Sequence, residues 1–421
     1  MVLLLELGVV IPVGNLKNSI SITFLGNLAF AISQWLIISF VVRIGPLKDV
    51  GMYALALSIV SPIFSFFSMN LMSIQATDVK NQYSFKEYLL FKVVTSIGAV
   101  FCVVIVLLVI ALDIYSSFLI LAYSLVKVVE SFNELSYGQY QKKERMDLVA
   151  RSLLWRSLLG SSLFCFIYYS TLELIYSVIG LSFAWSVVAI FVDGKASVPK
   201  DDTNSGHAKG SKAILSILLT AIPLGFVVFC NTINLNVPRY FVTYYMNEEM
   251  LGVYAAVSYF IIAGAILINA AGQSATARLA MLYLYNKKQF ICLLNKLILF
   301  ALGVGVLGNI FSYYLGGIVL TLFYSKQFES YAWLLNFVMF SGIFVYTSAM
   351  VGSGLTAMRR FTIQAYLASM VVVVIFITAW LTVPRFGLTG AALSVAVGYG
   401  FKLFIAYTIL YMEVSRSDIK S

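Results

Sequence analysis

Polar and ionisable side chains recur at three- and four-residue steps along residues 114–141, an otherwise apolar stretch. This polar stripe would occupy one face of a helix and consists of Tyr123, Lys127, Glu130, Glu134, Tyr137 and Gln141. A lone charge in a hydrocarbon layer costs at least ~2.5 kcal/mol, so Lys127 is expected to face protein or water. Two interpretations stay open: the stripe contacts a substrate or an ion, or Lys127 and Glu130 form a purely structural pair.

A second group of candidate residues lies in the segment FCNTINLNVPRYF, residues 229–241. Asn231 and Asn234 would share a helical face, and Pro238 is expected to break the helix just before Arg239. The guanidinium of Arg239 could hold two oxygens of a phosphate at once, which a lysine cannot do with the same geometry. The alternative is that Arg239 only anchors the end of the helix at an interface.

Weaker candidates lie in the first and last apolar segments. Arg43 ends the first segment as Arg239 ends the seventh, and Gln34 lies seven residues after Asn27, on the same helical face. Lys402 lies within the twelfth segment. Amides inside membranes often only bridge helices, so each of these side chains could equally be structural.

Signals of catalysis are missing from the sequence. The four cysteines are scattered without metal-ligand spacing, the single histidine, His207, lies in a polar loop, and there is no nucleotide-binding glycine loop. We therefore expect no cofactor, no metal site and no enzymatic activity.

The elements that must carry these side chains follow from composition. Apolar residues make up 61% of the 421 residues, charged residues only 11%, and the mean hydropathy is +0.93. Such a chain has too few charges to coat a soluble domain, and apolar runs long enough to cross a bilayer, about 20 residues, recur throughout. They predict twelve membrane-spanning helices at residues 18–42, 50–74, 89–112, 114–138, 153–171, 174–192, 213–237, 251–272, 297–311, 332–355, 362–383 and 388–412.

The basic residues predict the topology. Nineteen loop lysines and arginines fall on one side of the twelve spans, and five, Arg43, Lys48, Arg239, Lys326 and Arg385, fall on the other. Positive charge marks the cytoplasmic side, so both termini are expected there, and the net charge of +10 needs no nucleic-acid partner to explain it. Residues 1–17 are not expected to be a signal peptide, because Glu6 and Pro12 interrupt the apolar run.

The chain divides into two halves that resemble each other. A polar segment at residues 193–212 predicts a cytoplasmic linker between a six-helix bundle at 1–192 and another at 213–421. The pattern Gly-x-Tyr-Ala opens the second span at Gly51 and the eighth at Gly252. Six is an even number, so the halves would run in the same direction, related by a pseudo-two-fold axis along the membrane normal. The predicted fold class is all-α integral membrane, with a cavity between two bundles.

Several motifs carry a resemblance to a known family. The segments NLNVPRYF at 234–241, LGVYAAVSYF at 251–260, QSATARLA at 273–280, GMYALALSIVSP at 51–62 and FGLTGAALS at 386–394 resemble polysaccharide-unit flippases of the MATE-like (MOP) transporter superfamily. The resemblance covers nearly the whole chain. It implies two six-helix bundles around a cationic cavity, alternating access, and a bacterial inner-membrane location.

The resemblance also implies a substrate, an oligosaccharide on undecaprenyl pyrophosphate that is moved to the outer leaflet for O-antigen, capsule or exopolysaccharide assembly. The expected pyrophosphate contacts are Lys127, Arg239 and Arg43. Those expected for sugar hydroxyls or a coupling ion are Asn231, Asn234, Gln34 and Glu130, with Glu130 the candidate carboxylate for an H⁺ or Na⁺ gradient. A polysaccharide polymerase and a chain-length regulator are the implied protein partners, besides membrane lipids.

Three other functions remain as alternatives. A drug or metabolite exporter of the same superfamily would share the architecture but would need a cavity dominated by carboxylates. A membrane glycan polymerase would be an enzyme with a long outer loop, whereas the longest one expected here, residues 238–250, is short. A fourteen-helix peptidoglycan-precursor flippase would need two more spans than this length readily supplies.

Overall fold

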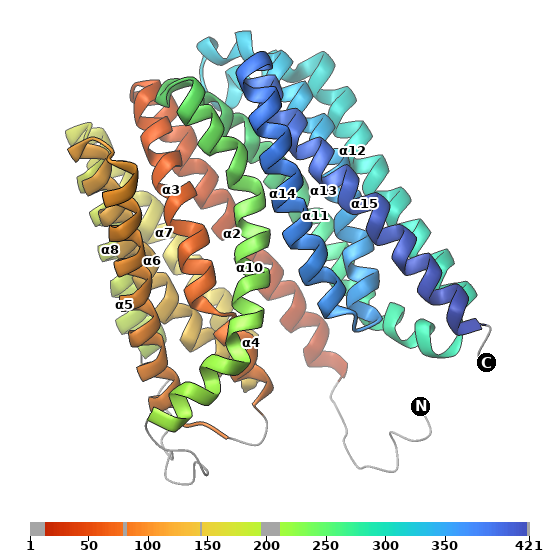
Figure 1. The fold of residues 1–421 in the computed structure, drawn as a ribbon. Helices are drawn as coiled ribbons and strands as arrows, with labels where there is room; N and C mark the ends of the chain where they lie inside the picture. Colours follow the sequence, from red (N-terminus) through yellow and green to blue (C-terminus); the bar gives the residue numbers. More distant parts are fainter. Residues whose placement is uncertain (1–12, 79–81, 144, 195–210, 419–421) are drawn as a thin grey trace.

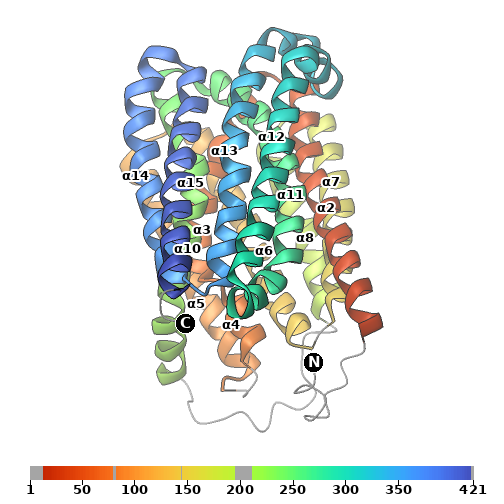
Figure 2. The same ribbon diagram turned by 90° about the vertical axis from the view of Figure 1, so that its right-hand side faces the viewer.

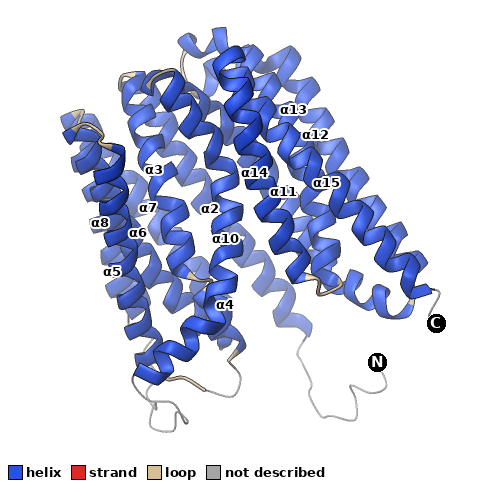
Figure 3. Ribbon diagram, viewed as in Figure 1, coloured by secondary structure: helices blue, strands red, loops and turns tan. Residues whose placement is uncertain are grey.

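The computed structural model describes residues 13–78, 82–143, 145–194 and 211–418. Within these ranges the chain is helical, with no strand (Figure 3). The elements are α2 (Val13–Ile44), α3 (Leu47–Ser68), α4 (Leu71–Thr77), α5 (Phe85–Ile110), α6 (Ile114–Lys142), α7 (Met146–Thr171), α8 (Leu174–Val188), the π-helical turn η1 (Ala189–Asp193), α10 (Ser211–Tyr245), α11 (Glu248–Tyr285), α12 (Lys287–Phe323), the 3₁₀ turn η2 (Lys326–Tyr331), α13 (Ala332–Ala357), α14 (Phe361–Phe386) and α15 (Leu388–Asp418).

Eleven of the described helices or helix pairs are long and apolar enough to cross a membrane. The remaining predicted span, the fifth (residues 153–171), corresponds to α7, which is 26 residues long but carries Asp147, Arg151 and Arg156. It packs between α2 and α8 in the same bundle (Figure 2). Asp147 and Arg151 are exposed near its lower end, and only Arg156 is buried, so we count α7 as a span with one internal charge that its neighbours cover. The all-helical membrane fold predicted from the sequence is confirmed.

The helices form two groups, α2 to α8 and α11 to α15, with α10 running between them (Figure 1). We call the face where α3 and α11 begin the upper face, and the face where α2 begins and α15 ends the lower face. The lower face is the side predicted to be cytoplasmic. Residues 195–210 of the predicted linker lie outside the described part of the chain. So do residues 1–12 of the segment 1–17 that was not expected to be a signal peptide.

The two groups share one apolar core at the upper face. This core joins side chains from α2, α3 and α6 to side chains from α11, α13 and α15, including Tyr53 and Tyr254 of the repeated Gly-x-Tyr-Ala motif. Toward the lower face the cores separate: Leu279, Leu294 and Leu355 pack only within α11 to α15. The ribbons diverge in the same direction (Figure 1), so the groups are closed together above and apart below.

Helix α10 contacts both groups. Its lower half packs on α3, α4 and α5, where Ile217 and Ala221 join a core with Met69, Tyr88 and Phe91. Its upper half contacts α14, through Asn234 and the carbonyl oxygen of Ala368. The helix therefore connects the two groups.

Two local predictions from the sequence are wrong. Pro238 does not end a helix, because α10 continues to Tyr245 and leaves a connection of only two residues before α11. A proline is tolerated inside a membrane helix where neighbouring helices hold the segment in place, and Val237 and Val242 are fully packed around it. The predicted span 297–311 is too short, since α12 runs unbroken from Lys287 to Phe323 with Gly316 packed against Ala332.

Candidate functional site

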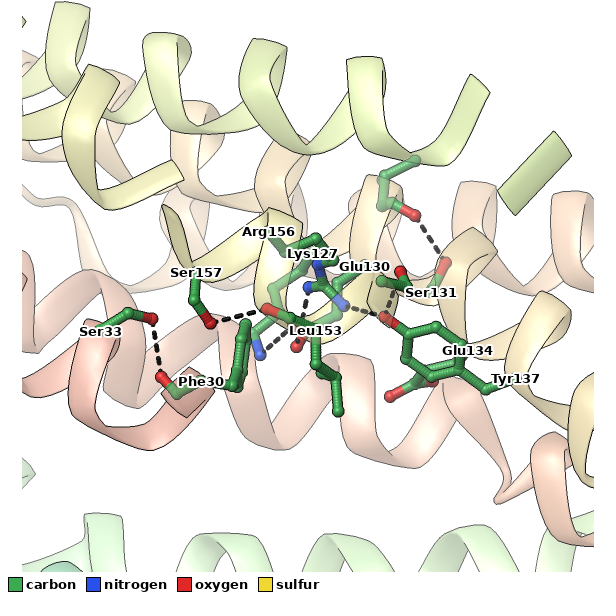
Figure 4. A network of polar contacts seen from close by, with 12 residues as sticks. Phe30, Ser33, Lys127, Glu130, Ser131, Glu134, Tyr137, Leu153, Arg156 and Ser157 are labelled. Carbon is green, nitrogen blue, oxygen red and sulfur yellow. Dashed lines mark hydrogen bonds and ion pairs between the residues drawn. The ribbon is translucent and has the colours of Figure 1, made fainter. Parts of the chain in front are cut away.

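The centre of the candidate site is a carboxylate held between two cations. Glu130 on α6 accepts a hydrogen bond from Lys127 Nζ at 2.5 Å, and Arg156 Nη2 on α7 lies 3.5 Å from its other oxygen. Figure 4 shows both basic side chains converging on Glu130. The spacing of three residues places Lys127 and Glu130 on one face of α6, as the polar stripe predicts.

Two aromatic side chains hold the guanidinium of Arg156 in position. It is only 2% exposed, with its guanidinium carbon 4.0 Å from the ring centre of Trp185 and 5.0 Å from that of Phe30. A guanidinium over an aromatic face is stabilised by the ring quadrupole, and this orients the cation toward Glu130. Arg156 Nη1 also donates to the hydroxyl of Tyr137 at 3.2 Å, so two members of the stripe are tied to it.

A second ion pair lies one turn below on the same stripe. Lys92 Nζ on α5 is 3.5 Å from Glu134, and Ser68 Oγ at the end of α3 donates to the same carboxylate oxygen at 3.0 Å. Lys92 is almost completely buried, whereas the side chain of Glu134 is 39% exposed. The buried Lys92 therefore holds Glu134 in position by an ion pair, while the Glu134 carboxylate remains accessible from the cavity.

The polar network continues to the lower face. The hydroxyls of Tyr137 and Ser152 lie 2.9 Å apart, and Ser152 donates to Asp193 at 2.9 Å. Tyr140 donates to the backbone oxygen of Asp193 at 3.0 Å. The stripe is thus connected, through hydroxyl groups, to the last residue of η1, where the described part of the first group nearly ends.

A cavity of about 170 Å³ opens beside this cluster, between α3, α4, α6 and α10. Its charged lining residues are Lys127, Glu130 and Glu134, and the rest of the lining is mostly hydroxyl and amide, with three apolar side chains: Ser61, Phe64, Ser65, Ser68, Asn70, Met72, Ser131 and Val228. A wall of this kind offers donors and acceptors to a polyhydroxylated ligand and a cation to an anionic one.

The lining itself carries two carboxylates and one lysine, but the buried cations Lys92 and Arg156, which pair with these carboxylates, turn the balance toward an anion. The cations Lys92, Lys127 and Arg156 stand against the carboxylates Glu130 and Glu134, which leaves one net positive charge when all five are ionised. In a low-dielectric interior such an excess is compensated by a ligand of opposite charge more strongly than it would be in water.

The structure brings only Lys127 and Glu130, of the predicted site residues, to this cavity. Asn234 is fully buried and donates to Ala368 on α14, while Asn231 is exposed on α10 and Gln34 is half-buried on α2. These three lie outside the cavity lining.

The two predicted arginines lie near the upper face. Lys127 is about 20 Å below the upper end of α6 at 1.5 Å per residue, but Arg239 is only about 9 Å below the upper end of α10. Arg239 donates to Asn236 of its own helix at 3.0 Å. Arg43 donates from Nε to the carbonyl oxygen of Phe323 at 3.4 Å and from Nη2 to that of Leu322. Neither arginine lines the cavity.

Two basic residues of the site were missed from the sequence, Lys92 and Arg156. Both lie inside predicted membrane spans, where an ionisable residue marks a functional position by default, and this signal could have identified them. They supply the positive charge that the sequence prediction left to Arg43 and Arg239.

Removing Arg156 is expected to destabilise the protein. The Arg156→Gln variant leaves Glu130 with one cation and Tyr137 without its charged donor, at a cost of about 1–3 kcal/mol. The apparent melting temperature of the purified protein in detergent should fall by several degrees. The control is Arg145→Gln, which removes the exposed pair with Asp147 and should change it little. Equal melting temperatures for the two variants would show that the Arg156 contacts carry no stability.

The fold is that of the MOP-superfamily transporters. It superposes on an inward-facing multidrug resistance MATE family transporter with a TM-score of 0.72 at 15% identity, covering 95% of this chain and 96% of the other. An outward-facing transporter of that description matches with a TM-score of 0.66 at 14% identity over 96% and 97%. A MOP superfamily transporter from Pyrococcus furiosus, described as having a binding pocket of reverse polarity, matches at 0.64 and 15% over 95% and 96%.

In sequence the chain is similar to the capsular polysaccharide biosynthesis protein CapF of Staphylococcus aureus. The two are 27% identical over 396 residues, which cover 93% of this chain and 98% of CapF. No family model matches the chain. The predicted resemblance is confirmed at this level: the chain is similar to a capsular polysaccharide biosynthesis protein, and its fold is that of solved MATE transporters of the MOP superfamily.

Proposed function

We propose that the protein is a flippase that carries oligosaccharide units linked to undecaprenyl pyrophosphate from the cytoplasmic to the outer leaflet. The observation that carries this proposal is the cavity lined by serine hydroxyls and Lys127, with the buried cations Lys92 and Arg156 paired to the two glutamates of its lining. A pyrophosphate and its sugars cannot cross hydrocarbon unaided, whereas the polyprenyl tail can remain in the bilayer. The similarity to a capsular polysaccharide biosynthesis protein supports the same substrate class.

In this proposal the lower face is cytoplasmic and the structure is the inward-facing state of an alternating-access cycle in a bacterial inner membrane. The shared core at the upper face would be the closed outer gate, and the separate cores below would flank the entrance. The pyrophosphate would lie near Lys127, with the sugars against the serine hydroxyls and Glu134. A polysaccharide polymerase and a chain-length regulator would act on the delivered units.

An ion gradient of H⁺ or Na⁺ would drive the cycle. Glu130 is already held by Lys127 and Arg156, and its charge is therefore compensated without a further ion. Glu134 has one cation partner and a more exposed side chain. We therefore favour Glu134 over Glu130 as the carboxylate that exchanges a coupling ion.

The experiment that tests the proposed function is deletion of the gene in its native host. Surface polysaccharide should be lost, and lipid-linked oligosaccharide units should accumulate in the cytoplasmic leaflet, because synthesis continues without export. Unchanged surface polysaccharide would contradict the proposal. Increased sensitivity to cationic drugs with normal surface polysaccharide would instead support a drug exporter. The three cations that surround the two carboxylates of the cavity disfavour a cationic substrate.

A further inference from the structure

The upper end of α12 is held by side chains from the other helical group. Its carbonyl oxygens at Leu322 and Phe323 accept hydrogen bonds from Arg43, and that of Phe323 also accepts one from Ser39. The last carbonyls of a helix have no partner within the helix and carry the negative end of its dipole. Helix α12 has no basic residue in its last turn, so the complementary charge comes from α2.

Aromatic contacts extend this junction. Trp35 on α2 donates from Nε1 to the hydroxyl of Tyr324 at 3.1 Å, and Tyr324 donates to the carbonyl oxygen of Ala256 on α11 at 2.7 Å. The rings of Trp35 and Phe323 are 4.7 Å apart. Ser39, Arg43 and Trp35 therefore bind α2 to the end of α12, and we call these three residues the α2 latch.

Among the described residues, the latch has no counterpart at the related position of the second half. Arg239, which occupies the position related to Arg43 in the second half, donates to Asn236 on its own helix instead of reaching across. The two arginines therefore make different contacts. Arg43 is the one that joins the two groups, and it does so away from the cavity.

We infer that Arg43 is a positioning residue of the transport cycle, which holds the upper face closed by binding the C-terminal carbonyls of α12. This inference rests on the proposed alternating access of the two groups. When they part above, Arg43 and Ser39 must release Leu322 and Phe323, and these groups become solvated. Arg43 sets the balance between the two states and does not bind the pyrophosphate.

The test is a distance measurement across the upper face of the purified protein without substrate. Spin labels replace Leu172, in the connection between α7 and α8, and Phe386, at the end of α14, in a background with the four cysteines removed. The wild-type protein should show mainly the short, closed distance. Arg43→Ala should raise the ratio of open to closed molecules roughly fivefold to tenfold, as expected for loss of a charge at a helix C-terminus.

Three further variants sharpen the test. Arg43→Lys should restore much of the closed population because it keeps the charge, and Ser39→Ala, a milder change, should shift the ratio in the same direction as Arg43→Ala. The matched control is Arg385→Ala, an exposed arginine at the upper face without a recorded ion pair or hydrogen bond in the described part of the chain; it should leave the ratio unchanged.

The inference is overturned if neither Arg43→Ala nor Ser39→Ala shifts the ratio. It is also overturned if Arg43→Ala leaves the ratio unchanged but weakens binding of a soluble pyrophosphate-linked sugar, because Arg43 would then be a substrate contact. Neither result depends on polysaccharide export in cells, so failure of the latch and failure of the proposed flippase function are distinguishable.

Discussion

Replacing Lys127 with alanine is expected to reduce polysaccharide export about tenfold to hundredfold. Lys127 is the cation that lines the cavity, and a hydrogen bond to a charged group contributes about 1.5–3 kcal/mol. In the variant Glu130 keeps Arg156 as a partner, and the net charge around the cavity falls to zero. Export is measured as surface polysaccharide in a deletion strain that carries the variant gene, at equal amounts of membrane-inserted protein.

Two variants serve as controls for the role of Lys127. Lys127→Arg keeps the positive charge and should retain a substantial part of the export, whereas Lys326→Ala removes an exposed lysine at the upper face and should have no effect. If Lys127→Ala exported polysaccharide at the wild-type rate, the Lys127–Glu130 pair would be only structural, which is the alternative that the sequence left open.

Valine at Gly51 or Gly252 is expected to prevent closure of the upper face. The two glycines lie where α3 and α11 begin and touch: a Cβ atom on Gly51 would overlap the carbonyl oxygen of Glu248, and one on Gly252 would lie 2.6 Å from that of Leu47. Overpacking of such a contact costs about 1–3 kcal/mol, which corresponds to a loss of export of about fivefold to hundredfold. The contact joins the two groups, so each group should still fold.

Measurements on the glycine variants should separate blocked closure from misfolding. The spin-label distance across the upper face should lengthen in Gly51→Val and Gly252→Val while the yield of folded protein stays near that of the wild type. The matched control is Gly303→Val in α12, where no atom lies within 4 Å of the added Cβ. Normal export by both Gly51→Val and Gly252→Val would mean that this helix contact is not part of the transport cycle.

The spans could be predicted from the sequence because bilayer thickness imposes a length and because charge marks the loops. The repeated Gly-x-Tyr-Ala motif indicated a duplication, but its role as the contact between α3 and α11 depends on how the halves pack. Pro238 was wrongly expected to break α10, because local helix rules do not include the neighbouring helices that hold Val237 and Val242 in place.

The polar stripe of the candidate site was visible in the sequence because Lys127 and Glu130 are three residues apart on one helix. The counter-charges Lys92 and Arg156 come from α5 and α7, so their contacts with Glu134 and Glu130 arise only from tertiary packing. Arg43 was expected to meet the pyrophosphate on the basis of its position alone. Its bonds to the end of α12 depend on the approach of the two groups, about which the linear sequence carries no signal.

The most direct test of the account is movement of a lipid-linked glycan across a membrane that contains only the purified protein. Undecaprenyl pyrophosphate bearing the host's repeat unit is placed in proteoliposomes with an imposed H⁺ or Na⁺ gradient, and its exposure to an external glycan-cleaving enzyme is followed over time. Wild-type protein should render the internal pool cleavable, and Lys127→Ala should leave it protected. Equal protection in wild-type and protein-free vesicles under both gradients would contradict the proposed function.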